Sequence, residues 1–302
     1  MTVFALPLAS AISYFQAVVL GLLQGVTELF PISSLGHTVL FPTLFGWQRV
    51  VAIQSQSESP WLAFVVMLHV GSALGLLWFY RRNWVQIIAA FLRTLAKRRI
   101  ETPTERLAWL IVVASIPAGV LGLAFEHTFR TLTAKPLAAA IALMANGLVL
   151  IAAERYRRRA EVRALAVREG AKRDGGRELR TLAYREALVI GAAQSTGLVA
   201  GISREGVTMG AGLARGLDHS DSARFAFLLA TPIILAAGVF KLPDLTGHYG
   251  IRGQAVVACL AAAVAAVFTV RFLVGYFRTR TLTPFAVYCL LFGFAMILYT
   301  QS

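Results

Sequence analysis

Six long apolar stretches recur along the chain, and each approaches the length of a membrane-spanning helix. A helix needs about 20 consecutive apolar residues to cross the hydrocarbon core of a bilayer. We therefore predict an all-α polytopic membrane protein. The six predicted spans are about 60–80, 105–125, 137–153, 222–242, 254–276 and 284–300.

Two further apolar segments, about 11–46 and 184–218, are interrupted halfway by polar residues and helix breakers. The first contains "LLQGVTELFPISSLGHTVLF", in which Glu28 and His37 lie among apolar residues on either side of Pro31. An ionisable side chain at membrane depth is costly and indicates a functional site. Irregular backbone at that depth is tolerated only where it is buried in protein or lines a cavity.

Basic residues gather between particular spans, in segments 81–104, 154–183 and 277–283. The positive-inside rule puts these loops in the cytoplasm. The second interrupted segment must then enter and leave on the cytoplasmic side, and the first enters and leaves on the outer side if the N-terminus is outside. We predict that both are re-entrant hairpins of broken half-helices.

The two interrupted segments also match in sequence. When "QGVTELFPISSLGHT" (24–38) is placed above "QSTGLVAGISREGVT" (194–208), five of the fifteen positions are identical. Each half of the chain is then a hairpin followed by three spans, and three spans invert the second half. We predict an inverted repeat, whose broken helices meet near the midplane. Its parts are 1–153, a basic cytoplasmic linker at 154–183, and 184–302.

Composition supports this class and excludes others. The chain has 302 residues, of which 57% are hydrophobic and only 15% charged; a soluble domain carries about 25% charged residues. The net charge of +14 lies in the inter-span loops, so we expect no nucleic-acid binding. The start, "MTVFALPLAS", lacks the basic region of a cleaved signal peptide. Cys259, Cys289 and Asn146 lie inside apolar runs; we expect packing roles for the cysteines and an interhelical hydrogen bond for Asn146.

The two interruptions carry groups suited to a phosphate. Arg204 supplies a permanently charged fork, and each half-helix that starts after a break offers free N–H groups to an anion. Glu28, one turn after Gln24, could hold a divalent cation that bridges phosphate oxygens. Ser34 and His37 could act as nucleophile and base. This chemistry indicates phosphoryl transfer. The full set is Gln24, Glu28, Ser33, Ser34 and His37 in the first segment, with Gln194, Ser203, Arg204, Glu205 and Thr208 in the second.

Simpler interpretations exist for single residues of this set. His37 alone is compatible with a buried histidine whose nitrogens are satisfied, and Ser33 and Ser34 with helix N-caps. Glu28 and Arg204 are harder to explain structurally, because charges at membrane depth are expensive. Their positions in two matching segments favour the functional interpretation.

These motifs resemble those of the bacterial undecaprenyl-diphosphatase family associated with bacitracin resistance. That family has a motif of Glu or Gln, three residues and Glu, followed by P-x-S-S-x-G-H. Here these stand as "QGVTE" (24–28) and "PISSLGH" (31–37). Its second motif resembles P-G-x-S-R-S-G-x-T and stands here as "AGISREGVT" (200–208). The resemblance extends over most of the chain, including the layout of two hairpins and six spans.

The resemblance implies hydrolysis of undecaprenyl diphosphate to undecaprenyl phosphate and inorganic phosphate, which recycles the lipid carrier of cell-wall synthesis and confers bacitracin resistance. It implies a divalent cation, Mg²⁺ or Ca²⁺, and a site that opens to the periplasmic side of the bacterial cytoplasmic membrane. A homo-oligomer is compatible with the sequence. We expect the site to comprise Glu28, Ser34, His37 and Arg204 as catalytic residues, Ser33, Ser203, Thr208 and Gln194 as substrate-binding residues, and Glu28, Gln24 and Glu205 as metal ligands.

Two mechanisms and one rival function remain open. Either Ser34 attacks phosphorus with His37 as base or leaving-group acid, or an activated water attacks directly. The chain departs from the family pattern at Ala200, in place of proline, and at Glu205, in place of serine. Glu205 could add a metal ligand or pair with Arg204. The rival function is a transporter or flippase of a phosphorylated lipid or small organic anion, which the same inverted repeat would suit.

Overall fold

The structure is a computed structural model, and it describes residues 12–54, 61–132, 135–167, 178–246 and 251–301. Every element in these ranges is helical. The predicted limits at residues 11 and 60, the middle of the basic linker (168–177) and loop residues 247–250 lie outside the described ranges. The elements are α1 (Tyr14–Thr27), α2 (Ser34–Leu44), α3 (Gln48–Gln54), α4 (Trp61–Phe79), α5 (Arg81–Lys97), α6 (Pro103–Leu132), α7 (Pro136–Val167), η2 (Leu179–Thr181), α8 (Tyr184–Ser195), η3 (Thr196–Leu198), α9 (Arg204–Ala214), α10 (His219–Thr246), α11 (Arg252–Tyr276) and α12 (Thr283–Gln301).

Within the described residues, six helices are long and apolar enough to cross a membrane, which confirms the predicted polytopic class. They are α4, α6, α7, α10, α11 and α12, and they correspond one to one with the six predicted spans. α6 and α7 continue beyond the predicted ends, to Leu132 and Val167. The residues that extend α7, "ERYRRRAEVRALAV", contain no glycine or proline and are rich in strong helix formers. The first part of the predicted linker is therefore helix.

The segment 81–104 was predicted as a loop, and that prediction is wrong, because most of it forms α5. Ile87, Ala90 and Thr94 are spaced three or four residues apart and are buried. The Trp109 indole of α6 donates a hydrogen bond to Thr94 Oγ1 (2.9 Å). Arginines and lysine on the other face explain why the segment had the charge pattern of a loop.

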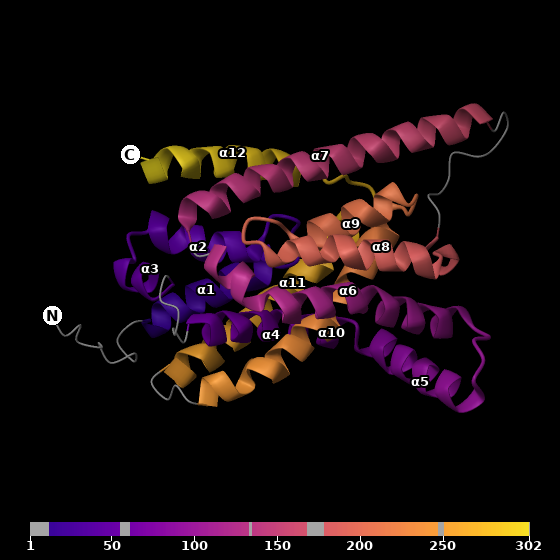
Figure 1. Ribbon diagram of the computed structural model, residues 1–302, viewed down its shortest axis with the longest axis horizontal. Helices are drawn as coiled ribbons and strands as arrows, with labels where there is room; N and C mark the ends of the chain where they lie inside the picture. Colours follow the sequence, from indigo (N-terminus) through magenta and orange to yellow (C-terminus); the bar gives the residue numbers. More distant parts are fainter. Residues whose placement is uncertain (1–11, 55–60, 133–134, 168–177, 247–250, 302) are drawn as a thin grey trace.

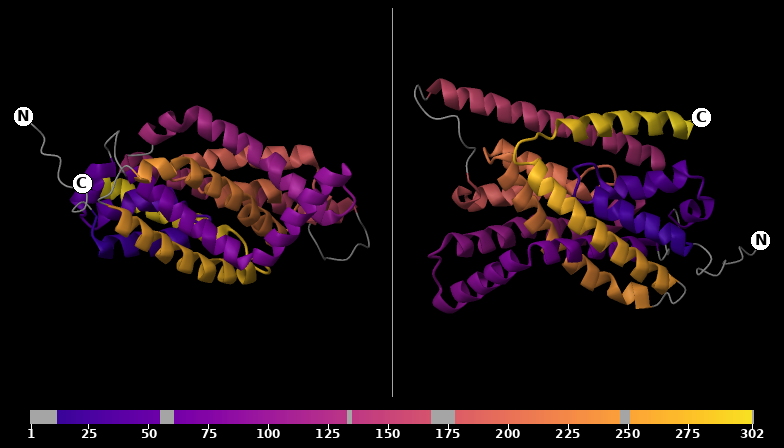
Figure 2. Two further views of the ribbon diagram at one scale, coloured as in Figure 1. Left: turned by 90° about the horizontal axis from the view of Figure 1, so that it is seen from below. Right: turned by 180° about the vertical axis from the view of Figure 1, so that it is seen from behind.

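The two interrupted segments each form a pair of short helices. α1 has 14 residues, α2 and α9 have 11 each, and α8 has 12, so each is too short to span a bilayer alone. Figure 1 shows α1, α2 and α3 toward the end of the molecule that holds the last turns of α12, whereas α8 and α9 lie toward the end that holds α5. The views in Figure 2 show the same separation.

Small residues allow α1 and α4 to pack closely on α11. A Cβ added at Gly25 of α1 would lie 2.6 Å from Ala265 Cβ of α11, and one at Gly71 of α4 would lie 2.9 Å from Ala262 Cβ. α1 and α4 therefore both contact the alanine-rich α11 at close range. Glycine and alanine contacts of this kind are typical of helix packing in membranes.

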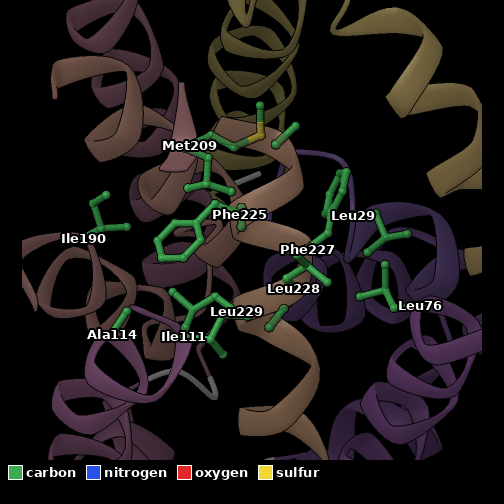
Figure 3. Close-up of a cluster of buried hydrophobic side chains, with 14 of the residues drawn as sticks. Leu29, Leu76, Ile111, Ala114, Ile190, Met209, Phe225, Phe227, Leu228 and Leu229 are labelled. Atoms are coloured by element: carbon green, nitrogen blue, oxygen red, sulfur yellow. The ribbon is translucent and has the colours of Figure 1, made fainter. Parts of the chain in front are cut away.

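The largest buried cluster of side chains centres on α10. Phe225, Phe227 and Leu228 are almost fully buried there, and the cluster also includes Leu29 after α1 and Met209 of α9. Figure 3 shows the α10 side chains lying between Met209 on one side and Leu29 on the other. This core fixes the two hairpin tips relative to each other, and the tips carry the candidate site.

Candidate active site

The first hairpin tip is the turn between α1 and α2. α1 ends at Thr27 with Glu28 as its C-cap, and α2 begins after Ser33, whose φ of 68° is rare for a residue with a side chain. Ser33 Oγ accepts hydrogen bonds from the N–H of Gly36 (3.2 Å) and from the N–H of Gly201 in the second hairpin (3.0 Å). The N-cap of one hairpin is thus also a contact to the other.

The second tip is the turn between η3 and α9, and its backbone lies against the backbone of the first tip. Gly201 has φ +101°, and a Cβ added at Gly36 would lie only 3.1 Å from Gly201 Cα. Ser203 caps α9 by accepting from the N–H of Gly206 (3.0 Å). Both helices therefore begin close together, with their N-termini in the same buried region.

Asn146 of α7 links the two tips. Its side-chain N–H donates to the carbonyl of Pro31 (3.0 Å), and its carbonyl oxygen accepts from the N–H of Ser203 (2.9 Å). Asn146 is completely buried. We predicted an interhelical hydrogen bond here; the structure shows a bridge from a span to both irregular turns.

Aligned positions of the two hairpins make the same local hydrogen bonds. Ser33 and Ser203 are the N-caps of α2 and α9. One turn later, Thr38 Oγ1 donates to the carbonyl of Ser34 (2.8 Å), and Thr208 Oγ1 donates to the carbonyl of Arg204 (2.7 Å). The hydroxyls of Ser33, Ser203 and Thr208 are therefore engaged with backbone.

Glu28 is the centre of the polar cluster between the tips, and it is 3% exposed. Its Oε2 accepts from Gln24 Nε2 (2.9 Å) and from the Ser34 hydroxyl. Its Oε1 accepts from Arg204 Nη2. The structure therefore brings three of the predicted residues, Gln24, Ser34 and Arg204, from both hairpins, onto the carboxylate of a fourth.

His69 of α4 also belongs to this cluster, and our sequence analysis missed it. Its Nδ1 lies 2.8 Å from the carbonyl of Val65, which can only accept, so Nδ1 donates and Nε2 faces the cluster. Nε2 lies 3.3 Å from Glu28 Oε2 and 3.5 Å from Ser34 Oγ. A signal was present, since a lone histidine inside "FVVMLHVGSALG" is an ionisable group within a span.

His37 lies elsewhere, with both ring nitrogens engaged. Nδ1 is 2.7 Å from the carbonyl of Ser33, and Nε2 is 2.8 Å from the Tyr288 hydroxyl of α12. Its ring stacks on Tyr288 and Phe292 with centroids 5.7 and 5.3 Å away. The predicted pairing of Ser34 with His37 has no counterpart among the described contacts, and His69 occupies that position.

Arg204 lies between two carboxylates. Besides Glu28, its Nε is 3.4 Å from Oε1 of the neighbouring Glu205, which is 3% exposed. This is the geometry of the pairing that the sequence left open for Glu205. Gln194, at the position aligned with Gln24, is buried in α8, and neither its side-chain oxygen nor its nitrogen has a hydrogen-bond partner in the described structure.

The polar cluster offers part of the ligand set that a divalent cation needs. The described residues contain no group of three or more His, Cys, Asp or Glu side chains that could hold a metal ion. However, Gln24 Oε1 is buried without a hydrogen-bond partner, on the side chain that contacts Glu28. Mg²⁺ is commonly held by one or two carboxylate or carbonyl oxygens together with water and substrate phosphates. The oxygens of Gln24 and Glu28 fit such an open site.

The sequence of the chain also matches a known protein family. The sequence profile described as "Bacitracin resistance protein BacA" matches residues 17–295, which is nearly the whole chain and includes both hairpins. The chain belongs to this family.

Curated relatives align with this chain over almost their full length. Undecaprenyl-diphosphatase 2 of Frankia alni is 53% identical, covering 93% of this chain and 96% of the relative. Undecaprenyl-diphosphatases of Mycolicibacterium paratuberculosis and Mycobacterium avium are 52% and 51% identical, covering 95% and 97% of this chain. The two alignments cover 97% of the Mycolicibacterium paratuberculosis protein and 99% of the Mycobacterium avium protein.

Proposed function

We propose that this protein is an integral membrane phosphatase that hydrolyses undecaprenyl diphosphate to undecaprenyl phosphate and inorganic phosphate. The observation that carries the proposal is the convergence of Ser34, Arg204 and His69 on Glu28, in a chain of the bacitracin-resistance family. A carrier has no need of a hydroxyl held against a carboxylate, so this cluster favours the phosphatase over the transporter.

Ser34 is the proposed nucleophile. Its hydroxyl already donates to Glu28 Oε2, and a general base must lie within hydrogen-bond reach of the proton that it takes. As Oγ bonds to the terminal phosphorus, its proton passes to Glu28, the bond to the bridging oxygen breaks, and undecaprenyl phosphate leaves. Water then displaces the phosphoryl group from Ser34, whose oxygen recovers the proton from Glu28 while the proton of water leaves with phosphate.

Arg204 is the proposed stabiliser of negative charge. Phosphoryl transfer spreads charge over the equatorial oxygens, and a guanidinium can bind two of them. The N-termini of α2 and α9 begin beside it and favour anions. The carboxyl group of Glu205 lies 3.4 Å from Arg204 Nε, so substrate phosphate would approach the guanidinium beside a second acidic side chain.

A divalent cation completes the proposal. Gln24, Glu28 and, as the less direct candidate, Glu205 would supply its protein ligands. When bound, it would neutralise phosphate charge as a Lewis acid. In the competing mechanism, water attacks phosphorus directly and Ser34 serves only as a donor.

The remaining features of the proposal concern the membrane. The first hairpin lies at the end opposite the basic helix α5 (Figure 1), which supports a site that opens toward the outer side of a bacterial cytoplasmic membrane. Aromatic rings of Phe41, Tyr288 and Phe292 surround His37 beside the cluster, and Tyr288 is 37% exposed. They offer an apolar surface for a prenyl chain. Recycling of the lipid carrier and bacitracin resistance would follow from the reaction.

The test is phosphate release from undecaprenyl diphosphate by purified protein in detergent, with Mg²⁺ or Ca²⁺ and then with chelator. We expect release that chelator abolishes and that Glu28→Gln and Arg204→Ala each reduce by at least about a hundredfold. Glu101→Gln, an exposed carboxylate on the α5–α6 turn, is the matched control and should retain activity. Absence of phosphate release from folded wild-type protein would contradict the proposal and favour the transporter.

A further inference from the structure

A second cluster of charged side chains lies away from Glu28, where three segments distant in sequence meet. These are the part of α7 around Arg157, the start of α10 and the loop 277–281 between α11 and α12. They line a partly open cavity of about 210 Å³. Its polar lining includes Arg157, Arg278, Arg280, Asp218, Thr279 and Thr281.

A buried carboxylate holds this cavity together. Glu154 of α7 is 3% exposed, and its Oε1 lies 2.5 Å from His219 Nε2 at the start of α10. The same oxygen accepts from the N–H of Leu282, the residue before α12 (2.9 Å). Arg157 Nε lies 3.8 Å from the other oxygen. One side chain therefore fixes all three segments, so the cavity is a built feature of the fold.

The cavity favours anions. Of the three arginines that line it, Arg157 lies against Glu154, whereas the one aspartate of the lining, Asp218, already accepts from the N–H of Asp221 at 2.6 Å. Arg278 and Arg280 are exposed, and neither makes an ion pair with any residue that the structure describes. Two arginine forks beside threonine hydroxyls are a typical arrangement for a phosphate group.

The ends of the spans are where lipid head groups are expected, and the cavity lies there. It is formed where the spans α7 and α11 end and where α10 and α12 begin, and the basic loop 277–283 belongs to the predicted cytoplasmic face. Basic pockets between spans on that face are known to hold anionic lipid head groups.

We propose that this cavity binds the phosphate of an anionic phospholipid of the cytoplasmic leaflet. The lipid would join α7, α10 and the α11–α12 loop, reinforcing the contacts that Glu154 makes. The proposal is independent of the phosphatase reaction, because none of these residues belongs to the Glu28 cluster.

The test is native mass spectrometry of purified protein titrated with phosphatidylglycerol or with phosphatidylcholine. Wild-type protein should retain phosphatidylglycerol preferentially, and Arg278→Gln/Arg280→Gln should weaken that binding by about tenfold. Arg81→Gln/Arg82→Gln, two exposed arginines of α5, is the matched control and should keep the preference. If the double variant fails size-exclusion chromatography, Arg280→Gln alone provides the same comparison.

Three results would overturn the proposal. Equal losses in both double variants would assign the preference to general surface charge. An equal retention of the two lipids by wild-type protein would remove the specificity for an anion. Displacement of phosphatidylglycerol by inorganic phosphate at the same concentration would assign the cavity to free phosphate and not to a lipid.

Discussion

At the scale of single residues, the groups that surround Glu28 determine what the site can do. A carboxylate buried at membrane depth is stable only if it is paired and hydrogen-bonded. Glu28 is contacted by an amide, a hydroxyl, a guanidinium and an imidazole, so its charge is compensated and its position is fixed. The same contacts direct Ser34 and Arg204 toward a common point.

The two adjacent serines should differ sharply. Ser34→Ala removes the proposed nucleophile, and we expect kcat to fall by about a thousandfold or more. Ser33→Ala removes an N-cap and leaves the Gly201 N–H unpaired, which should lower stability by about 1–3 kcal/mol. The measurement is kcat and thermal unfolding for both variants. Full activity in Ser34→Ala would contradict the nucleophile assignment and support direct attack by water.

The two histidines provide a second comparison. His69→Gln should lower kcat by about a hundredfold with little change in stability, because Nε2 lies beside Ser34 and Glu28. His37→Gln should mainly lower the unfolding temperature, because it loses a buried, fully hydrogen-bonded ring. The check is kcat and unfolding temperature measured on the same preparations. A large kcat loss in His37→Gln alone would reverse the two roles.

At the scale of elements, the site depends on two irregular turns held by backbone contacts. Asn146→Leu should destabilise the protein by several kcal/mol, because it leaves the Pro31 carbonyl and the Ser203 N–H buried without partners, at about 1–3 kcal/mol each. Gln86→Ala, on the exposed face of α5, is the control. Unfolding followed by circular dichroism measures the difference, and equal stability of the two variants would show that the bridge is unimportant.

The close approach of the tips can be tested with glycine. Gly36→Ala places a Cβ 3.1 Å from Gly201 Cα, so one tip must move, and we expect phosphate release to fall by about tenfold or more. Gly119→Ala in α6 meets nothing within 4 Å and should leave activity unchanged, with up to about 1 kcal/mol of added helix stability. Equal activity in both variants would mean that the tips tolerate separation.

The elements also show what the sequence could and could not predict. The spans were predictable because each is a continuous apolar run, and the hairpins because Pro31 and the glycines interrupt such runs. α5 was missed because its sequence contains several basic residues and only a few positions that are buried, so its composition is that of a loop. His69 and Asn146 were not assigned to the site because their partners, Glu28, Pro31 and Ser203, lie far away in sequence, and no local pattern records such contacts.

At the scale of the whole molecule, the chain builds one site from both halves. The core around α10 includes Leu29 of the first hairpin and Met209 of the second (Figure 3), and Asn146 joins both tips to a span. The matching N-caps and threonine bonds of α2 and α9 agree with a repeat of the two hairpins. That the second half is an inverted copy of the first stays a prediction.

Glu28 of one hairpin and Arg204 of the other should act as one catalytic unit, and the decisive experiment is a double-mutant cycle on kcat/KM. Residues that act as a unit are strongly non-additive. We predict that Glu28→Gln/Arg204→Ala loses little more activity than the worse single variant. Losses that multiply in the double variant would show that the two residues act independently and would contradict a single site shared by both hairpins.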